Sequence, residues 1–338
     1  MDNGAFSISG GLVTGIGGLP NRSARDAVRT SLRLLELPAI PALPRRSPAE
    51  GAVAQAMVGM QGITVGQYGS ISVDPSAVDP LAPVVTDLAH DAFVGFRTFL
   101  NMAPEVRPDL RAVKWQFIGP VTFGLALVRA GVPASEAFES AVRGVRTRID
   151  DLLDAVAAAL PGVRQVVFLE EPALAEMMDP GFPLPPDIAI DLVSGALAAV
   201  EPRAVAGLHV CGFADVPSQL AAGPAIVSMP VHSDVLQSAG YLVRFMERGG
   251  FVAWGAVSTN GPIATTAERA WRELNGIWTE LVDRGADPML LRRQSVITPE
   301  CGLAAHTPAV AERVLRLAAE VGGRVRDQAS AERWVLGA

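Results

Sequence analysis

The 338-residue sequence has few of the residues that characterise small secreted scaffolds or nucleic-acid-binding proteins. It contains only two cysteines, Cys211 and Cys301, which are too few for a disulfide framework. Lysine occurs once, at Lys114, and we attribute the preference for arginine to coding bias. With 28 basic and 35 acidic residues the net charge is −7, so no nucleic-acid partner is expected.

Long apolar runs are also absent. The stretches 152–160 and 196–200 end at Pro161 and Glu201, well short of the roughly 20 residues that a membrane span requires. The N-terminal segment MDNGAFSISG lacks both the basic region and the continuous apolar core of a signal peptide. Since 49% of the residues are hydrophobic, the sequence predicts a soluble, cytoplasmic protein with a large core and no membrane partner.

Short apolar runs alternate with longer amphipathic ones, which is typical of βα units around a parallel sheet. Eight units predict an α/β fold over residues 1–338, a single (β/α)8 TIM barrel whose closure leaves no exposed edge strand. An open doubly wound sheet is the alternative, but the glycines of GLVTGIGGLP lead to Pro20 and not directly into a helix. The expected strands are Gly11–Gly17, Pro38–Ala42, Ala112–Ile118, Gln165–Glu170, Val205–Val210, Ala225–Met229, Phe251–Val257 and Gln294–Thr298.

Amphipathic stretches between these strands predict the helices. The segment Gly62–Val73 alternates in hydrophobicity, which predicts a short hairpin inserted after the second strand. His90 falls within the next predicted helix, as a surface or packed residue. The expected helices are Ser23–Leu35, Pro48–Met60, Leu81–Met102, Ser135–Leu160, Pro186–Val200, Val235–Arg248, Thr266–Arg284 and Pro308–Val321, with a weaker helical turn at Ala214–Ala222.

Reactive side chains occur where the barrel strands are predicted to end. His209 and Cys211 are two residues apart on one strand, so their side chains point to the same side. Cys301 follows the last strand, and all strand ends open onto the same mouth of a barrel. One histidine and two cysteines suit zinc and leave a coordination position open, as in catalytic sites. The alternative is that both cysteines are buried core thiols; His306, near Cys301, could also approach the mouth.

Five motifs then give the sequence a resemblance to a known family. GLVTGIGGLP near the start, IGPVTF at 118–123, EEPAL at 170–174, LHVCG at 208–212 and TPECGL at 298–303 occur in the expected order. Together they resemble the catalytic domain of cobalamin-independent methionine synthase. That family belongs to one barrel superfamily with uroporphyrinogen decarboxylase, and this chain is similar to its shorter, core-type members.

The resemblance implies a zinc ion held by His209, Cys211 and Cys301. Zinc would bind the sulfur of homocysteine and deliver a thiolate, which attacks a methyl group on a donor to give methionine. The family's substrate-binding residues correspond to Glu170, which contacts the amino group, and to the backbone near Ile16 and Gly18 on the carboxylate side.

The chain departs from the family pattern at four places. A glutamate ligand after the sixth strand is replaced in the stretch Val227–Pro230, so His232 is the candidate for that ligand position, although it could also be a loop histidine. Asn260 stands where the family has a proton-relaying histidine, and asparagine can donate a hydrogen bond but cannot shuttle a proton. A folate-stacking tryptophan is absent from 124–128, and the segment Val65–Val73 replaces one that helps to bind homocysteine.

These features predict a zinc-dependent S-methyltransferase that acts on a thiol, most simply homocysteine. The missing histidine and tryptophan favour a methylcorrinoid or corrinoid protein over folate as the methyl donor. Two alternatives stay open: a corrinoid-linked enzyme for another thiol, and a degenerate barrel that binds a small molecule or metal without catalysis. A zinc-free decarboxylase-like member fits less well, because Asn21, Arg22 and Ser23 follow GIGGLP where that branch uses acidic residues.

Overall fold

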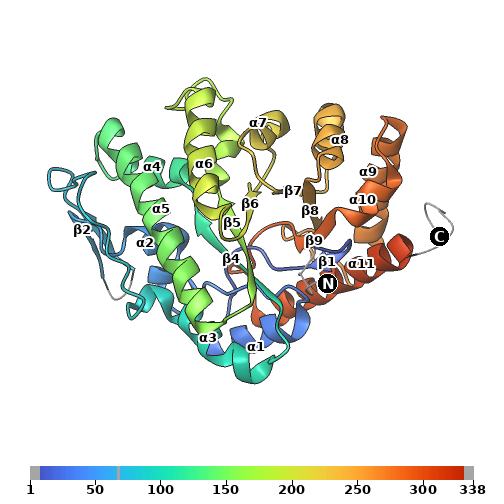
Figure 1. The fold of residues 1–338 in the computed structure, drawn as a ribbon, viewed down its shortest axis with the longest axis horizontal. Coiled ribbons are helices and arrows are strands. Elements are labelled where there is room, and N and C mark those ends of the chain that lie inside the picture. Colours follow the sequence, from blue (N-terminus) through green and yellow to red (C-terminus); the bar gives the residue numbers. More distant parts are fainter. Residues whose placement is uncertain (1–7, 67–68, 331–338) are drawn as a thin grey trace.

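The structure, a computed structural model, describes residues 8–66 and 69–330. Seven parallel strands form one curled sheet in the order β1-β9-β8-β7-β6-β5-β4, and helices surround it (Figure 1). This α/β architecture is compatible with a TIM-like barrel. The strands are β1 (Leu12–Val13), β4 (Ala112–Ile118), β5 (Arg164–Glu170), β6 (Val205–His209), β7 (Ile226–Pro230), β8 (Phe251–Val257) and β9 (Ser295–Pro299).

The helices follow the strands and pack against the outer side of the sheet. Two of them, α4 and α10, are not among the helices expected from the sequence. The α-helices are α1 (Ala24–Leu34), α2 (Ala52–Met57), α3 (Val94–Val106), α4 (Pro120–Arg129), α5 (Ala134–Ala159), α6 (Pro186–Val200), α7 (Val216–Ala221), α8 (Ala239–Glu247), α9 (Glu268–Asp283), α10 (Pro288–Arg293) and α11 (Pro308–Ser330). Short 3-10 helices are η1 (Pro48–Glu50), η2 (Asp91–Phe93), η3 (Pro172–Glu176) and η4 (Ser233–Ser238).

The expected strand Pro38–Ala42 does not form, and only one isolated bridge to β4 remains there. Its two prolines have no N–H to donate to a ladder. The segment nevertheless lies between the two edges of the sheet. The Leu37 N–H donates to the Val13 carbonyl (3.1 Å), and the Ile40 N–H donates to the Lys114 carbonyl (2.8 Å). Backbone hydrogen bonds therefore connect this segment to both β1 and β4.

The prediction of a helix over 81–102 is wrong in its first half. Residues 81–90 form turns, and the helical structure begins at η2. Asp79 and Asp87 each accept a hydrogen bond from the backbone N–H two residues on (2.8 Å), a local bond that competes with helix formation. His90 accordingly lies at the start of η2, where its Nδ1 accepts from the Ala92 N–H (3.1 Å).

A separate two-stranded sheet lies outside the main one. Strands β2 (Ile63–Val65) and β3 (Ile71–Val73) pair antiparallel, with Ile63 opposite Val73. They follow α2 in the chain.

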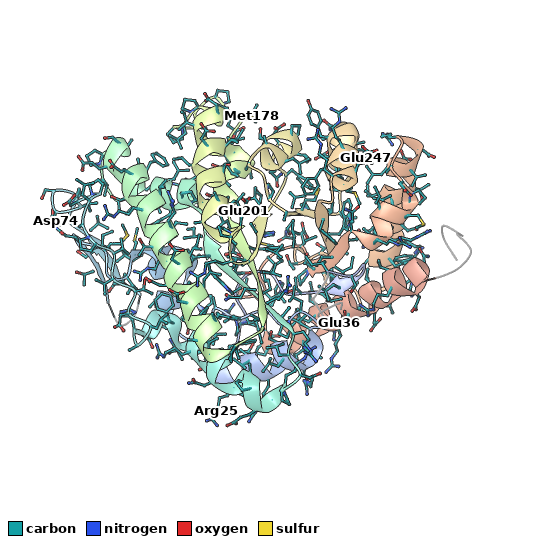
Figure 2. The ribbon with its side chains drawn as sticks, in the orientation of Figure 1. Arg25, Glu36, Asp74, Met178, Glu201 and Glu247 are labelled. Atoms are coloured by element: carbon teal, nitrogen blue, oxygen red, sulfur yellow. A yellow bond between two sulfur atoms is a disulfide. The ribbon has the colours of Figure 1, made fainter. Side chains whose placement is uncertain are left out.

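The core has an outer and an inner part. Between sheet and helices pack large side chains such as Trp115 on β4 and Trp254 on β8, both fully buried. On the inner side of the curled sheet a smaller cluster includes Phe168, Ile226 and Val296. Charged residues such as Arg25 and Asp74 lie at the outline of the molecule (Figure 2). No helix within the described part of the chain is long and apolar enough to cross a membrane.

Two glycines bring the segment after β1 against the segment after β9. Gly17 has a φ of +65°, and a Cβ there would lie 2.5 Å from Cα of Gly302. Next to this contact the Leu303 N–H donates to the Gly18 carbonyl (2.9 Å). Any side chain at Gly17 would push Gly302, and with it Cys301, away from the segment that follows β1.

Glu171 connects β5 to the start of α4. Its carboxylate accepts hydrogen bonds from the Val121 N–H (2.8 Å), the Thr122 N–H (2.7 Å) and the Thr122 hydroxyl (2.6 Å). A Cβ on Gly119, the N-cap residue, would lie 2.2 Å from this carboxylate. Glu171, directly after β5, thus caps the N-terminus of α4, because the N-cap residue Gly119 has no side chain to do so. Burial raises its pKa to about 7.

Replacing Gly17 by alanine should destabilise the fold by about 2–4 kcal/mol, through left-handed backbone strain and a backbone clash. The matched control is Gly162→Ala, because Gly162 has a similar φ of +79° and open space around its Cβ position. We expect the control to cost only about 1–2 kcal/mol. Denaturant unfolding of both variants measures the difference, and equal losses would contradict the close contact.

Replacing Glu171 by alanine should leave three donors without an acceptor and lower the free energy of unfolding by about 2–4 kcal/mol at acidic pH. Because the folded-state pKa of Glu171 is raised from 4.5 to about 7, its stabilisation is largest below pH 4.5 and declines as pH rises through 7. The difference in the free energy of unfolding between wild type and Glu171→Ala should therefore become smaller from pH 4.5 to pH 7. Urea unfolding at several pH values measures this difference. Thr122→Val, which removes one donor and no carboxyl, should show no such narrowing; a constant or widening gap for Glu171→Ala would contradict the account.

Candidate functional site

The three predicted ligands His209, Cys211 and Cys301 lie together where β6 and β9 end. Their ligand atoms are all within 4.8 Å of one another. Among the residues that the structure describes, this is the only group of three or more His, Cys, Asp or Glu side chains close enough to share a metal ion. The convergence arises because parallel strands end at the same side of the sheet.

The two cysteines are joined as a disulfide, with their Cα atoms 5.9 Å apart. The sequence predicts two separate thiol ligands and no bond between them. The thiolate, not the disulfide, is the metal ligand and the nucleophile. The set of three ligands is therefore available to a metal only when the disulfide is reduced.

His209 is held by hydrogen bonds on both ring nitrogens. Its Nδ1 lies 2.9 Å from Ser228 Oγ, and its Nε2 lies 3.1 Å from Cys211 Sγ. Burial lowers the pKa of His209 to about 3, and the positive charge of Lys114 contributes. The imidazole is therefore neutral near pH 7, which is the form that binds metals. Ser228 belongs to the stretch that lacks the family's glutamate, and sequence reasoning did not assign it a role.

His232 does not join this group. It is about half exposed, and its ring packs against Phe213 in a tilted arrangement, with centroids 4.2 Å apart. Its Nδ1 accepts from the Asp234 N–H (3.3 Å) at the start of η4 and lies 3.2 Å from the Asp234 carboxylate. The structure thus places His232 on the loop after β7, as an N-cap residue.

Two predicted substrate-binding residues line one small cavity of about 70 Å³ at the end of β5. Glu170 contributes the end of β5, directly opposite His209 in the strand register, and Gly18 contributes backbone. Ile16, two residues earlier, packs in the inner core. No described residue donates a hydrogen bond to the Glu170 carboxylate. Burial raises the pKa of Glu170, and the charge of Lys114 opposes this shift.

Lys114 and Gln116 are neighbours of this cavity that the sequence analysis missed. Lys114 is fully buried on β4 and donates to the Gly15 carbonyl (3.0 Å) and to Gln116 Oε1. Burial lowers its pKa to about 7, while Glu170 acts in the opposite direction. A sequence signal existed, because a lysine and a glutamine alternate with apolar residues in the run KWQFI.

Asn260 is exposed on the loop after β8. That loop is held by Glu300, whose carboxylate accepts from the Ser258 hydroxyl (2.8 Å) and from the Thr259 N–H (3.3 Å). His306 also contacts the loop, through Nε2 to the Thr259 carbonyl (3.0 Å). Glu300, the residue directly before Cys301, thus connects the loop of Asn260 to the end of β9.

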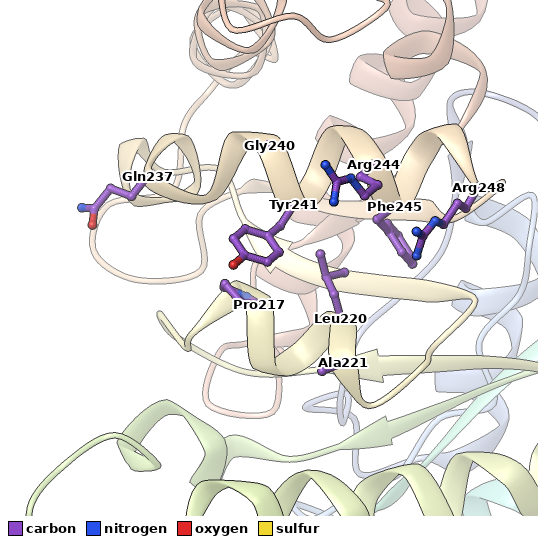
Figure 3. Close-up of a pocket in the computed structure, with 9 residues that line it drawn as sticks. All are labelled: Pro217, Leu220, Ala221, Gln237, Gly240, Tyr241, Arg244, Phe245 and Arg248. Carbon is purple, nitrogen blue, oxygen red and sulfur yellow. The ribbon is translucent and has the colours of Figure 1, made fainter.

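A larger groove of about 620 Å³ lies elsewhere, between α7 and α8 (Figure 3). Tyr241, Arg244 and Phe245 of α8 face Leu220 of α7 across it. None of the predicted site residues lines this groove, so it does not belong to the site at the strand ends.

No protein-family profile matches this chain, and no curated protein sequence matches it. Two solved structures share its architecture over nearly its whole length. One is a methyltransferase from Methanosarcina mazei, with a TM-score of 0.57 and 16% identity over 96% of this chain and 95% of that chain. The other has the provisional description of a vitamin-B12-independent methionine synthase from Listeria monocytogenes, with a TM-score of 0.58 and 14% identity over 95% of this chain and 99% of that chain. The chain therefore has the fold of these proteins.

Proposed function

We propose that this protein is a zinc-dependent methyltransferase that transfers a methyl group to a thiol, most simply that of homocysteine. One observation carries the proposal: a histidine nitrogen and two cysteine sulfurs lie within 4.8 Å of one another at the strand ends. The likeness to a methyltransferase of the same fold supports the reaction class. The remaining support comes from the cavity at the end of β5.

The residues fit a zinc ion once the disulfide is reduced. One imidazole and two thiolates are ligands that zinc prefers, and three protein ligands leave a position for substrate. Ser228 at Nδ1 of His209 leaves Nε2 for the metal and holds the ring in place, as outer-shell partners of metal ligands do. Bound zinc would lower the pKa of the substrate thiol and keep it as a thiolate at neutral pH.

The chain's own residues would bind and orient the rest of the substrate. Glu170 presents a carboxylate in the cavity beside His209, suited to an ammonium group. The backbone at Ile16 and Gly18 would lie on the carboxylate side of the substrate. Asn260, on an exposed loop at the mouth, would donate a hydrogen bond to the methyl donor and move no proton.

For the methyl donor we favour a methylcorrinoid or a corrinoid protein over a folate. The chain lacks the tryptophan that would stack on a pterin after GPVT. Residues 124–128 of α4 are small or aliphatic, and Phe123 is fully buried in the core.

The disulfide supports a second candidate function. If Cys211 and Cys301 stay joined, neither sulfur can serve as a thiolate ligand. The barrel would then bind a small molecule in the cavity without catalysing methyl transfer.

Metal analysis of protein purified with a reductant tests the proposal. We expect one zinc per chain in the wild type and little or none in His209→Ala and Cys301→Ser, because each variant removes one of only three ligands. Methyl transfer from methylcobalamin to homocysteine should fall at least about 100-fold in both. The matched control is His306→Ala, whose imidazole contacts the Thr259 carbonyl and should be dispensable for zinc.

Two results would contradict the proposal: a zinc-free wild type that still methylates thiols, or zinc retained in both ligand variants. His232→Ala decides the remaining ligand position, since zinc loss in that variant would make His232 a ligand. Comparing methylcobalamin with methyl-folate as donors tests the preference for a corrinoid.

A further inference from the structure

The chain's single lysine is fully buried on the inner side of the sheet, and each neighbour in contact with its ammonium is an acceptor. Lys114 Nζ donates to the Gly15 carbonyl (3.0 Å) and to Gln116 Oε1, and lies 4.7 Å from the centroid of the Phe168 ring. Gly207 makes room for that ring, because a Cβ there would lie 2.4 Å from it. Burying an ammonium costs several kcal/mol of desolvation free energy, so an apolar side chain at this position would make the fold more stable.

Lys114 determines which way the amide of Gln116 faces. In its charged form Lys114 has three donors and no acceptor, so the atom that contacts it is the amide oxygen, as in the structure. The amide nitrogen then faces the other way, and a Cβ on Gly17 would lie 3.9 Å from it. Among the described residues no acceptor takes up the Gln116 NH₂ group. Gln116 also lines the cavity, together with Gly18 and Glu170.

Among the polar groups that line the cavity, one donor and one acceptor without a hydrogen-bond partner come from adjacent strands. The other polar side chains in the lining are Glu50, whose carboxylate accepts from Leu43, Gly95 and Arg46, and Gln55, whose NH₂ group donates to the Ala92 carbonyl. Gln116 of β4 supplies the NH₂ group, and Glu170 of β5 supplies a carboxylate. A ligand that satisfies both carries an acceptor next to a donor, and the bonds are strongest when the acceptor is an anion and the donor a cation. An α-amino acid head group has this pattern, and a volume of about 70 Å³ suits a head group but not a whole cofactor.

We propose that Gln116 binds the carboxylate of an α-amino acid, and that Lys114 is the positioning residue that fixes the Gln116 amide for this contact. The inference rests on the proposed function for the view that Glu170 faces the substrate's ammonium. It adds two residues whose hydrogen bonds select amino acids over simple thiols.

Calorimetric titration of the full-length protein with two probes tests the proposal. The probes are L-methionine and methylthiopropylamine, which is methionine without its carboxylate. In Gln116→Met, an apolar replacement of similar size, L-methionine should bind about 10- to 100-fold more weakly, because a hydrogen bond to a charged group is lost. Binding of methylthiopropylamine should be unchanged.

Lys114→Met should show the same selective loss if Lys114 acts through Gln116. The double variant Lys114→Met/Gln116→Met should then bind L-methionine no more weakly than Gln116→Met alone, because the two effects are not independent. Additive losses, or equal losses for both probes, would assign Lys114 a merely structural role. If Lys114→Met fails to fold in a thermal melt, Gln116→Met alone still decides the carboxylate contact.

Failure of this inference is distinguishable from failure of the proposed function. Binding of methionine requires neither zinc nor a methyl donor. A protein that discriminates the two probes through Gln116 but does not methylate thiols contradicts only the proposed function. The inference is overturned if the wild type binds neither probe. It is also overturned if the enzyme is active and Gln116→Met binds L-methionine as tightly as the wild type.

Discussion

The register of three parallel strands is the constraint on which the site depends. In that register Glu170 of β5 lies opposite His209 of β6, and His209 lies opposite Ser228 of β7. Because alternate residues share one side of a strand, these side chains occupy one layer on the inner side of the sheet. A slip of one residue would turn each of them toward the helices. A change of register would therefore disrupt the cavity at Glu170 and the contact between His209 and Ser228 at the same time.

The same alternation gives two adjacent glutamates different roles. Glu170 faces inward and lines the cavity, whereas Glu171 leaves the strand and caps α4 with three hydrogen bonds. The inner side combines this polar layer with an ammonium, Lys114, whose acceptors are all provided by the chain. An interior filled only with apolar residues would be easier to stabilise, so this polar layer lowers the stability of the fold.

Much of this arrangement could be predicted from sequence. Apolar runs located six of the seven strands to within about two residues, and the spacing of His209, Cys211 and Cys301 predicted their convergence. Proline chemistry prevented the strand at Pro38–Ala42, and aspartate turns shortened the helix expected over 81–102. The disulfide could not be predicted, because it depends on how closely the ends of β6 and β9 approach.

Lys114 shows why the rest of the site was missed. That the chain has one lysine can be read from its composition. That this lysine is buried and donates to the Gln116 amide can be seen only in the structure. Such a pairing needs the register of β4 and β5 and the shape of the cavity, neither of which a single sequence contains.

X-ray absorption spectroscopy at the zinc edge, on reduced protein loaded with zinc, measures the proposed ligand set itself. We expect two sulfurs at about 2.3 Å from the zinc and at least one nitrogen at about 2.0–2.1 Å. Loss of the sulfur shell on reoxidation of Cys211 and Cys301 should follow. A shell of oxygen and nitrogen only, or no bound zinc in the reduced protein, would contradict the account.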